Sequence, residues 1–464
     1  MDAMVTREAG FSRDLHRFWT RLSSSSIRSS SLPIWAGTLP ARDLLLRDAR
    51  AFFHAAEPED LQALEAGKIE DIRHFDVAGM QKAVAICACG PSGSLLLSSC
   101  LDGHDDVIML PGLRSQAIYF FFERYPSLSL REKLTAYAFL FEFFQGEDRI
   151  AAADYYAAVN ALFKVYGDWP PEFLESRPAF FKFLHVVYCV ALGRLPVSAR
   201  PLIVYQQHVL DDELGRRLAE DFPQACFIHT VRDPITNCGR QFHHFLKFRG
   251  LLASAYVISH LTFADMPHPG MESRTLTIRF EDLHLRLEDT MRAVADWLGL
   301  AYQSALLEST FNGVPFVVGR GTTTWSGPRP EQAVRDSRNV SFTDRCLLSA
   351  VLYEDFLAWG YPCRRMFGQA AVRVLTCVLT LLIPMKMEIV TAGTLIKLLP
   401  SRGLRFFASG FVRVCICRIA IMSLLAVELY RRLAFGKQVL RISMIAQGER
   451  PTAAKLSDIH AAGE

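Results

Sequence analysis

Short apolar runs alternate with longer amphipathic stretches over residues 80–362. Two of the amphipathic stretches, 210–222 and 287–299, repeat leucine and other apolar residues at helical spacing. This alternation predicts an α/β domain with a mostly parallel central sheet and flanking helices. Four of the apolar runs have the length and composition of buried strands: 83–88, 202–206, 225–231 and 275–280.

The segments around this pattern differ from it in composition. Residues 1–78 form an expected N-terminal extension with the serine-rich linker "LSSSSIRSSSLP" and two short helices. Inside the α/β domain, a long helical stretch rich in aromatic residues is expected at about 115–190. The predicted organisation is therefore an extension over 1–78, the α/β domain over 79–362 and a helical tail over 363–464.

The tail is both apolar and basic. Its two apolar runs, "VLTCVLTLLIPMKMEIV" and "IAIMSLLAVELYRRLAF", fall short of the ~20 clean apolar residues that a membrane-spanning helix needs. From Cys363 to the end there are 15 Lys and Arg against five Asp and Glu, a net charge of +10, whereas the rest of the chain carries −7. Two structures suit this mixture: basic helices that lie on an anionic membrane surface, or a helical subdomain that packs on the body.

Cysteine usage and the N-terminus indicate the compartment. The eleven cysteines lie mostly in apolar runs and form no cluster with histidine, which favours buried reduced thiols over zinc or disulfides. The first residues, "MDAMVTREAGFSRDL", lack the apolar core of a secretory signal. We therefore expect a cytoplasmic protein, peripheral at the membrane if the tail binds lipid, and no nucleic-acid partner.

A turn of small residues, "CGPSGSLLL" at 89–97, joins the first predicted strand to a predicted helix. Such a turn lets another group approach the backbone closely, and a helix that starts at Gly93 or Ser94 offers free amides and a positive dipole. The turn therefore predicts a site for phosphate or sulfate. The alternative is a tight β-to-α connection in which Ser92 or Ser94 caps the helix.

The strand predicted at 225–231 ends in Arg232, Asp233 and Pro234, after which a helix begins. In an open α/β sheet, ligands bind beyond the carboxyl ends of the strands. If the two strands are neighbours, Arg232 lies beside the Gly90 turn and offers a planar charged donor suited to phosphate. The alternative role for this arginine is an ion pair with a nearby carboxylate.

Together these stretches resemble the sulfotransferases that use 3′-phosphoadenosine-5′-phosphosulfate (PAPS), over about residues 82–362. In that family a strand-loop-helix of the form P-[KR]-S-G-T-T binds the 5′-phosphosulfate, and "GPSGSLL" resembles it. A second strand ending in R-[DN]-P, with a serine eight residues after the arginine, binds the 3′-phosphate, and "VRDPITNCGR" resembles it. "IRFEDL" at 278–283 resembles the family's strand-helix unit, and "GRGTTTW" at 319–325 is similar to its late loop over the nucleotide.

This resemblance implies a P-loop-like sulfotransferase fold, PAPS as co-substrate and no metal. It assigns donor binding to ten residues: Gly90, Pro91, Ser92, Gly93, Ser94, Leu95, Arg232, Arg240, Arg320 and Gly321.

Two positions depart from the family pattern. Pro91 stands where the family has a basic residue, which stabilises the bridging oxygen during sulfuryl transfer. Arg240 stands where the family has the serine, and it can contact the 3′-phosphate through its charge instead of a hydroxyl. Three residues are candidates for supplying the missing cation: Lys247, Arg249 and Arg320.

His208 is the expected catalytic base, because cytosolic members of the family carry a catalytic histidine at a comparable place. It follows the strand predicted at 202–206, at the carboxyl edge of the sheet, and a histidine pKa near neutrality suits proton abstraction. Its alternative role is a capping or surface histidine, with Asp211, Asp212 and Glu213 as substitute bases.

The predicted function is transfer of a sulfuryl group from PAPS to a hydroxyl or amine of a carbohydrate or lipid-linked acceptor. The alternative is a catalytically decayed sulfotransferase fold that binds nucleotide or serves as a scaffold, which Pro91 and Arg240 suggest. A kinase is disfavoured because no Walker lysine follows the turn. "GPSGS" also lacks the G-x-S-x-G order of an esterase.

Overall fold

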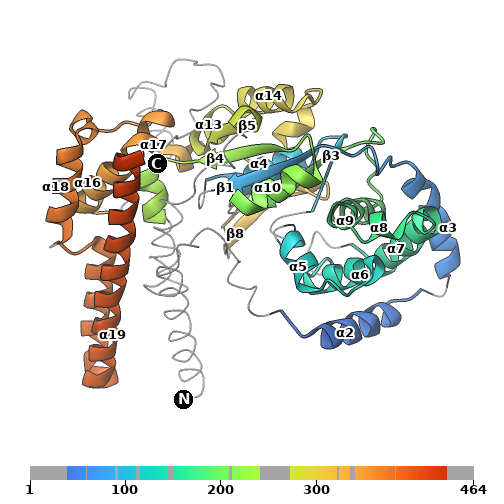
Figure 1. Cartoon of the computed structure of the whole chain (residues 1–464), viewed down its shortest axis with the longest axis horizontal. Coiled ribbons are helices and arrows are strands. Elements are labelled where there is room, and N and C mark those ends of the chain that lie inside the picture. The colour runs from blue at the N-terminus through green and yellow to red at the C-terminus, as the bar shows by residue number, and fades with distance from the viewer. Residues whose placement is uncertain are drawn as a thin grey trace.

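A five-stranded sheet lies between two layers of helices in the computed structural model of this chain (Figure 1). The strands run parallel in the order β2-β3-β1-β4-β5, which confirms the predicted α/β class. The strand bounds are Ala83–Ala88 (β1), Val107–Met109 (β2), Leu202–Gln207 (β3), Cys226–Val231 (β4) and Thr275–Arg279 (β5). The structure describes these residues: 39–58, 60–88, 92–110, 115, 117–144, 150–207, 212–240, 272–320, 323–334, 340–381 and 383–435.

Four of the five strands are those that the apolar runs predict. β1, β3, β4 and β5 coincide with the predicted runs to within one residue at either end. The sequence does not predict β2, because three residues are too few to form a hydrophobic pattern. In the parallel register, Ala85 of β1 pairs with Tyr205 of β3 and with Phe227 of β4, so distant parts of the chain share one core.

Alternate side chains of the strands enter two separate cores, one on each face of the sheet. Ala85 and Tyr205 pack into the core of one face, and Ile86 and Val204 into that of the other. The first core is covered by α2 (Arg42–Ala55), α3 (Leu61–Arg73), α5 (Ile118–Arg124), α6 (Leu130–Leu140), α7 (Ala152–Tyr166), α8 (Pro171–Leu174), α9 (Arg177–Leu192) and α10 (Asp212–Asp221). The second core is covered by α4 (Ser94–Leu101), α13 (Phe280–Leu285) and α14 (Leu287–Leu298).

The stretch predicted to be helical at 115–190 forms α5 to α9, and its aromatic residues fill the first core. The rings of Phe121 and Phe180 both meet the ring of Tyr137 edge to face. Their centroids lie 5.1 Å and 5.9 Å from the Tyr137 centroid. Because all three are fully buried, these rings serve core packing rather than ligand stacking.

Helices α2 and α3 confirm the two short helices expected before residue 79, and they belong to the first core. Leu45, Phe53 and Ile72 are buried in it. Residues 42–73 therefore stabilise the α/β domain directly. The serine-rich linker lies outside the described residues.

The C-terminal part forms a third core beside the carboxyl end of the sheet. It contains α16 (Phe342–Val351), α17 (Tyr353–Ala358), α18 (Ala370–Leu381) and α19 (Lys386–Phe435). Leu348 of α16 and Leu425 of α19 pack there together with Cys238, which lies on the helix that follows β4. Residues 421–425 of the tail are thus packed on the body.

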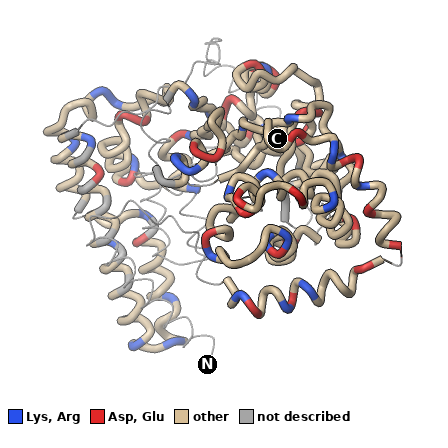
Figure 2. Tube along the Cα trace, turned by 45° about the vertical axis from the view of Figure 1, so that its right-hand side comes forward, with Lys and Arg blue, Asp and Glu red and all other residues tan. Residues whose placement is uncertain are grey.

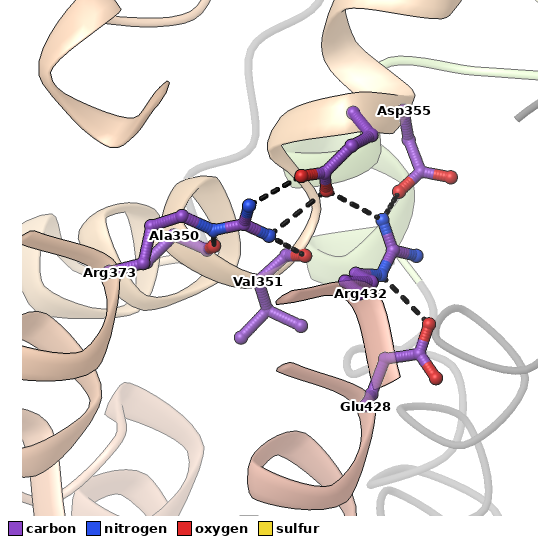
Figure 3. A network of polar contacts seen from close by, with 7 residues as sticks. Ala350, Val351, Asp355, Arg373, Glu428 and Arg432 are labelled. Carbon is purple, nitrogen blue, oxygen red and sulfur yellow. Dashed lines mark hydrogen bonds and ion pairs between the residues drawn. The ribbon is translucent and has the colours of Figure 1, made fainter. Parts of the chain in front are cut away.

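A buried network of charges fixes α18 and α19 to α17 (Figure 3). The Arg432 side chain is fully buried and pairs with Glu428 at 2.8 Å and with Asp355. Arg373 pairs with Glu354 and donates from Nε to the Ala350 carbonyl oxygen at 2.6 Å. Removing one partner from a buried network of this kind costs about 3–5 kcal/mol, so the network specifies how these helices dock.

Helix α19 folds back on itself at Gly403, where φ is 80° and ψ is 170°. A side chain at Gly410 would start 2.5 Å from the Cδ2 atom of Leu395, so the two halves lie close together. By length and composition alone, Glu388–Ala434 is apolar enough to cross a membrane, with a window of mean hydropathy 2.0.

Candidate active site

The turn after β1 holds a glycine in the left-handed conformation and leads into α4. Gly93 has φ 94° and ψ 8° and precedes Ser94, the first residue of α4. A side chain at Gly93 would start 3.0 Å from Leu283 Cδ1 and 3.2 Å from the ring of Phe280, so backbone and space both require glycine. Intrahelical hydrogen bonding begins with the Leu97 N–H donating to the Gly93 carbonyl, which leaves the earlier amides directed out of the helix end.

The Ser92 side chain joins this turn to the neighbouring strand β4. It is fully buried, and its Oγ lies 2.9 Å from the Oγ1 atom of Thr230. The Thr230 hydroxyl in turn donates to the Cys87 carbonyl oxygen at 3.2 Å. Because β1 and β4 pair in parallel, their carboxyl ends meet at one edge. The expectation that these strands are neighbours is confirmed, and Arg232 follows β4 at that edge.

Arg232 is a buried cation held in a fixed position. Only 3% of its surface is exposed, and its guanidinium carbon lies 3.8 Å from the centroid of the Phe280 ring. Its Nη2 donates to the Gln332 carbonyl oxygen at 2.9 Å. Burial lowers its pKa to about 10, a shift that Glu281 opposes and Arg240 assists. The group remains a cation at neutral pH in a site where an anion would be strongly favoured.

Arg240 lies on the helix that follows β4 and donates to Gln332, as Arg232 does. This helix begins at residue 234, and Asp233 caps it by accepting from the Thr236 N–H at 2.7 Å. Arg240 Nη2 donates to the Gln332 side-chain oxygen at 3.0 Å. Gln332, in α15 (Pro330–Val334), therefore accepts from both arginines that the sequence assigns to the 3′-phosphate. Their donors converge as a multi-oxygen anion requires.

Three further residues surround Arg232, and the sequence did not single them out. Glu281 accepts a hydrogen bond from the Tyr361 hydroxyl at 2.5 Å, and burial raises the pKa of its carboxyl group. The His284 Nδ1 accepts from the Arg329 N–H at 2.8 Å. Burial, assisted by the charge of Arg232, lowers the pKa of His284 to about 4, so the ring is neutral. The motif "IRFEDL" contains Glu281, but Tyr361 is too distant in sequence to be linked with it.

A neutral amide lies beside the start of α4. The Gln206 Nε2 donates to the Ser94 Oγ at 3.2 Å, and its backbone N–H bonds to Ser115. Gln206 is 1% exposed, and its Oε1 has no hydrogen-bond partner within the described ranges. Leu95 is half-buried against the second core, so only its backbone amide is placed for a ligand.

Several predicted site residues lie outside the described residues: Gly90, Pro91, His208 and Gly321. The same holds for Lys247, Arg249 and Asp211. The backbone of Arg320 is described. It lies in β8 (Val318–Arg320) and pairs with Thr323 of β9 (Thr323–Trp325) in an antiparallel hairpin. These roles therefore stay predictions.

His104 has a structural role, as its Nε2 lies 2.8 Å from the Ala301 carbonyl oxygen and its Nδ1 accepts from the Asp106 N–H. Among the described residues, no group of three or more His, Cys, Asp and Glu side chains is arranged to hold a metal ion.

The site thus combines a helix N-terminus and two converging arginines at one edge of a parallel sheet, an arrangement that favours the binding of anions. A family model described as "Sulfotransferase family" matches residues 83–304, which carry β1 to β5 and Arg240. Over these residues the chain is similar to the sulfotransferase family. No curated protein matches the sequence.

The solved structures that are similar to this chain include three sulfotransferases. The sulfotransferase domain of the Synechococcus PCC 7002 olefin synthase is 18% identical, covering 49% of this chain and 76% of its own, with a TM-score of 0.32. The sulfotransferase domain of the curacin biosynthetic pathway is 19% identical (49% and 77%, TM-score 0.31). Sulfotransferase STF9 from Mycobacterium avium is 13% identical (58% and 77%, TM-score 0.29). At these TM-scores the fold class rests on the observed sheet and the family match.

Proposed function

We propose that this chain is a sulfotransferase that uses PAPS as donor and transfers its sulfuryl group to a hydroxyl or amine of a carbohydrate or lipid-linked acceptor. One observation carries the donor assignment. The contact of Ser92 with Thr230 joins the turn before α4 to the strand that ends in Arg232. Sites for two phosphate-like groups thus lie at adjacent strands, as a nucleotide with both a 5′-phosphosulfate and a 3′-phosphate requires.

The 5′-phosphosulfate is proposed to bind at the start of α4, over Gly90 to Leu95. The free amides and the helix dipole favour an anion there, and glycine at position 93 removes the side chain that would block its approach. Buried Gln206 donates from Nε2 to the Ser94 hydroxyl oxygen and holds this side chain in place. The turn contributes backbone donors rather than charge.

The 3′-phosphate is proposed to bind Arg232 and Arg240, replacing Gln332 as their shared acceptor. The Arg232 guanidinium group stacks on the ring of Phe280, which keeps it in place when the phosphate replaces Gln332. Arg320, the last residue of β8, and Gly321, which follows it in the sequence, would close over the nucleotide.

In the proposed reaction the acceptor oxygen or nitrogen attacks the sulfur of PAPS in line with the bridging oxygen. A new bond from that atom to sulfur forms as the bond between sulfur and the bridging oxygen breaks, and adenosine 3′,5′-bisphosphate leaves. His208 would accept the acceptor's proton. Since Pro91 supplies no cation to the bridging oxygen, the charge there is stabilised by the α4 amides and by Lys247, Arg249 or Arg320.

The acceptor class rests on the tail. A basic and apolar tail packed beside the carboxyl edge of the sheet would hold the enzyme where amphiphilic, lipid-linked acceptors reside. A free carbohydrate acceptor would not need this tail.

The donor site is tested by comparing two nucleotides by isothermal titration calorimetry. Adenosine 3′,5′-bisphosphate should bind at least tenfold more tightly than adenosine 5′-monophosphate, which lacks the 3′-phosphate. In Arg232→Ala this preference should disappear, whereas Arg292→Ala, which changes an exposed arginine on α14, should keep it. Equal affinity of the unaltered protein for the two nucleotides would show that it has no site for the 3′-phosphate.

A further inference from the structure

Beyond the point where α19 is fixed to the body, its two halves form a projecting helical hairpin. Arg418 pairs with Glu388 across the hairpin and also donates to the Ile383 carbonyl oxygen at 2.8 Å. Residues 389–402 lead away from this ion pair, and the chain reverses direction at Gly403. Residues 404–417 then run back alongside residues 389–402. We call residues 389–417 the hairpin arms. Figure 2 shows them side by side, extending away from the third core.

The hairpin arms are far less packed than the rest of α19. Residues 418–435 pack in the third core and pair with α17 through buried Arg432. Within the arms, the described buried apolar residues are Leu395 and Val414, which pack on each other. Seven large apolar side chains of the arms are exposed, by 36–72%: Ile389, Val390, Ile396, Leu398, Leu404, Phe411 and Val412.

The charge of the arms has one sign. No Asp or Glu occurs between Glu388 and Glu428, whereas this interval contains five Lys and Arg. Three of these cations surround the turn and are exposed: Lys397, Arg402 and Arg405. Exposed aliphatic and aromatic side chains interleaved with exposed cations are the pattern of a helix that lies at a lipid interface.

We propose that the hairpin arms bind the surface of an anionic phospholipid bilayer. Each arm is roughly 20 Å long at about 1.5 Å per residue, whereas a bilayer core is about 30 Å thick, so the arms lie in the interface rather than across it. The apolar side chains enter the acyl boundary, and the cations remain with the lipid phosphates. A second copy of this chain is a poorer partner for the arms, because two identical cationic surfaces repel each other.

This inference is independent of the donor site and is tested without nucleotide. The full chain should co-sediment with vesicles of phosphatidylcholine and phosphatidylserine, and only weakly with phosphatidylcholine alone. Removal of one exposed cation should weaken binding to the phosphatidylserine vesicles by about fivefold. The substitutions are Lys397→Gln, Arg402→Gln and Arg405→Gln, each made alone. Leu404→Glu with Phe411→Glu should weaken it by at least roughly tenfold on both vesicle types.

Val197→Glu is the matched control, because this side chain is 75% exposed but lies on the α/β domain. It should bind vesicles as the unaltered protein does. Far-ultraviolet circular dichroism should show all variants equally helical, since every altered side chain is exposed. If the unaltered protein ignores both vesicle types, or if Leu404→Glu with Phe411→Glu instead dissociates a dimer in analytical ultracentrifugation, the membrane proposal is wrong and the arms contact protein.

Discussion

Arg232 donates a hydrogen bond from Nη2 to the backbone carbonyl oxygen of Gln332, over 2.9 Å. The side-chain oxygen of the same glutamine accepts from Arg240 over 3.0 Å. A phosphate group offers the same kind of acceptor with a full negative charge, so we expect it to compete with Gln332 for both guanidinium groups. Gln332 is therefore a sensitive position at which to test the 3′-phosphate site.

Gln332→Glu should weaken the binding of adenosine 3′,5′-bisphosphate by roughly tenfold, because a carboxylate would hold Arg240 through a charge-assisted hydrogen bond. Titration calorimetry at fixed salt measures the change. Gln332→Ala is the control: it leaves the Arg232 contact to the backbone intact and removes only the side-chain oxygen that competes for Arg240, so affinity should stay the same or rise. Unchanged affinity in Gln332→Glu would mean that Arg240 does not contact the nucleotide.

Gly93→Ala should lower the free energy of unfolding more than Gly193→Ala does. Gly193 also has a left-handed backbone, with φ 72°, but nothing lies within 4 Å of the position of a side chain there. Gly193→Ala should therefore cost about 1 kcal/mol from the backbone alone. Gly93→Ala should cost roughly 1–3 kcal/mol more, because the new methyl group presses on Leu283 and Phe280.

Urea unfolding of the two alanine variants measures this difference. Equal losses would show that the turn can move away from α13, and the tight fit at the start of α4 would no longer explain the glycine.

His284 should make stability depend on pH. Its folded pKa of about 4 lies below the usual 6.5, so the unfolded chain binds a proton between these values that the folded chain does not. Stability is therefore fully present above about pH 6.5 and falls as the pH drops towards 4, by up to about 3 kcal/mol. His284→Gln should reduce this slope in urea unfolding measured from pH 7 to 4.

Buried His185, with its pKa also lowered to about 4, should leave a residual slope in that variant. A slope that is the same with and without His284 would show that this ring takes up a proton in the folded state.

His208→Ala should lower turnover by roughly 10²–10⁴-fold and leave nucleotide affinity nearly unchanged, as expected on loss of a general base. The acid limb of the pH–rate profile should disappear with it. His54→Ala is the control, because this histidine is exposed on α2. Full turnover in His208→Ala would transfer the role to Asp211, Asp212 or Glu213, or show that the acceptor needs no base.

Local patterns predicted what depends on local physics. The apolar runs identified four strands, and the glycine-rich turn and Arg232 followed from where two of those strands end. The rule that ligands bind at the carboxyl edge of a parallel sheet then predicts that the turn and the arginine lie together.

Contacts between distant segments were not predictable in the same way. Gln332 reaches Arg232 across one hundred residues, and Tyr361 reaches Glu281 across eighty. Gln332 and Tyr361 lie in segments without a hydrophobic pattern or a motif, so the sequence does not single them out. The fold-back of α19 had a local signal that was overlooked: "LPSRG", which ends at Gly403, combines the residues that mark turns.

In the proposed reaction this chain moves a sulfuryl group from PAPS through a site built on Arg232. The most direct measurement is transfer of labelled sulfate from PAPS to a lipid and glycan extract, with the unaltered protein and Arg232→Ala side by side. We expect labelled product with the unaltered protein, and at least tenfold less with Arg232→Ala at low PAPS. No transfer by the unaltered protein, despite tight binding of adenosine 3′,5′-bisphosphate, would contradict the proposal and indicate a nucleotide-binding protein without this activity.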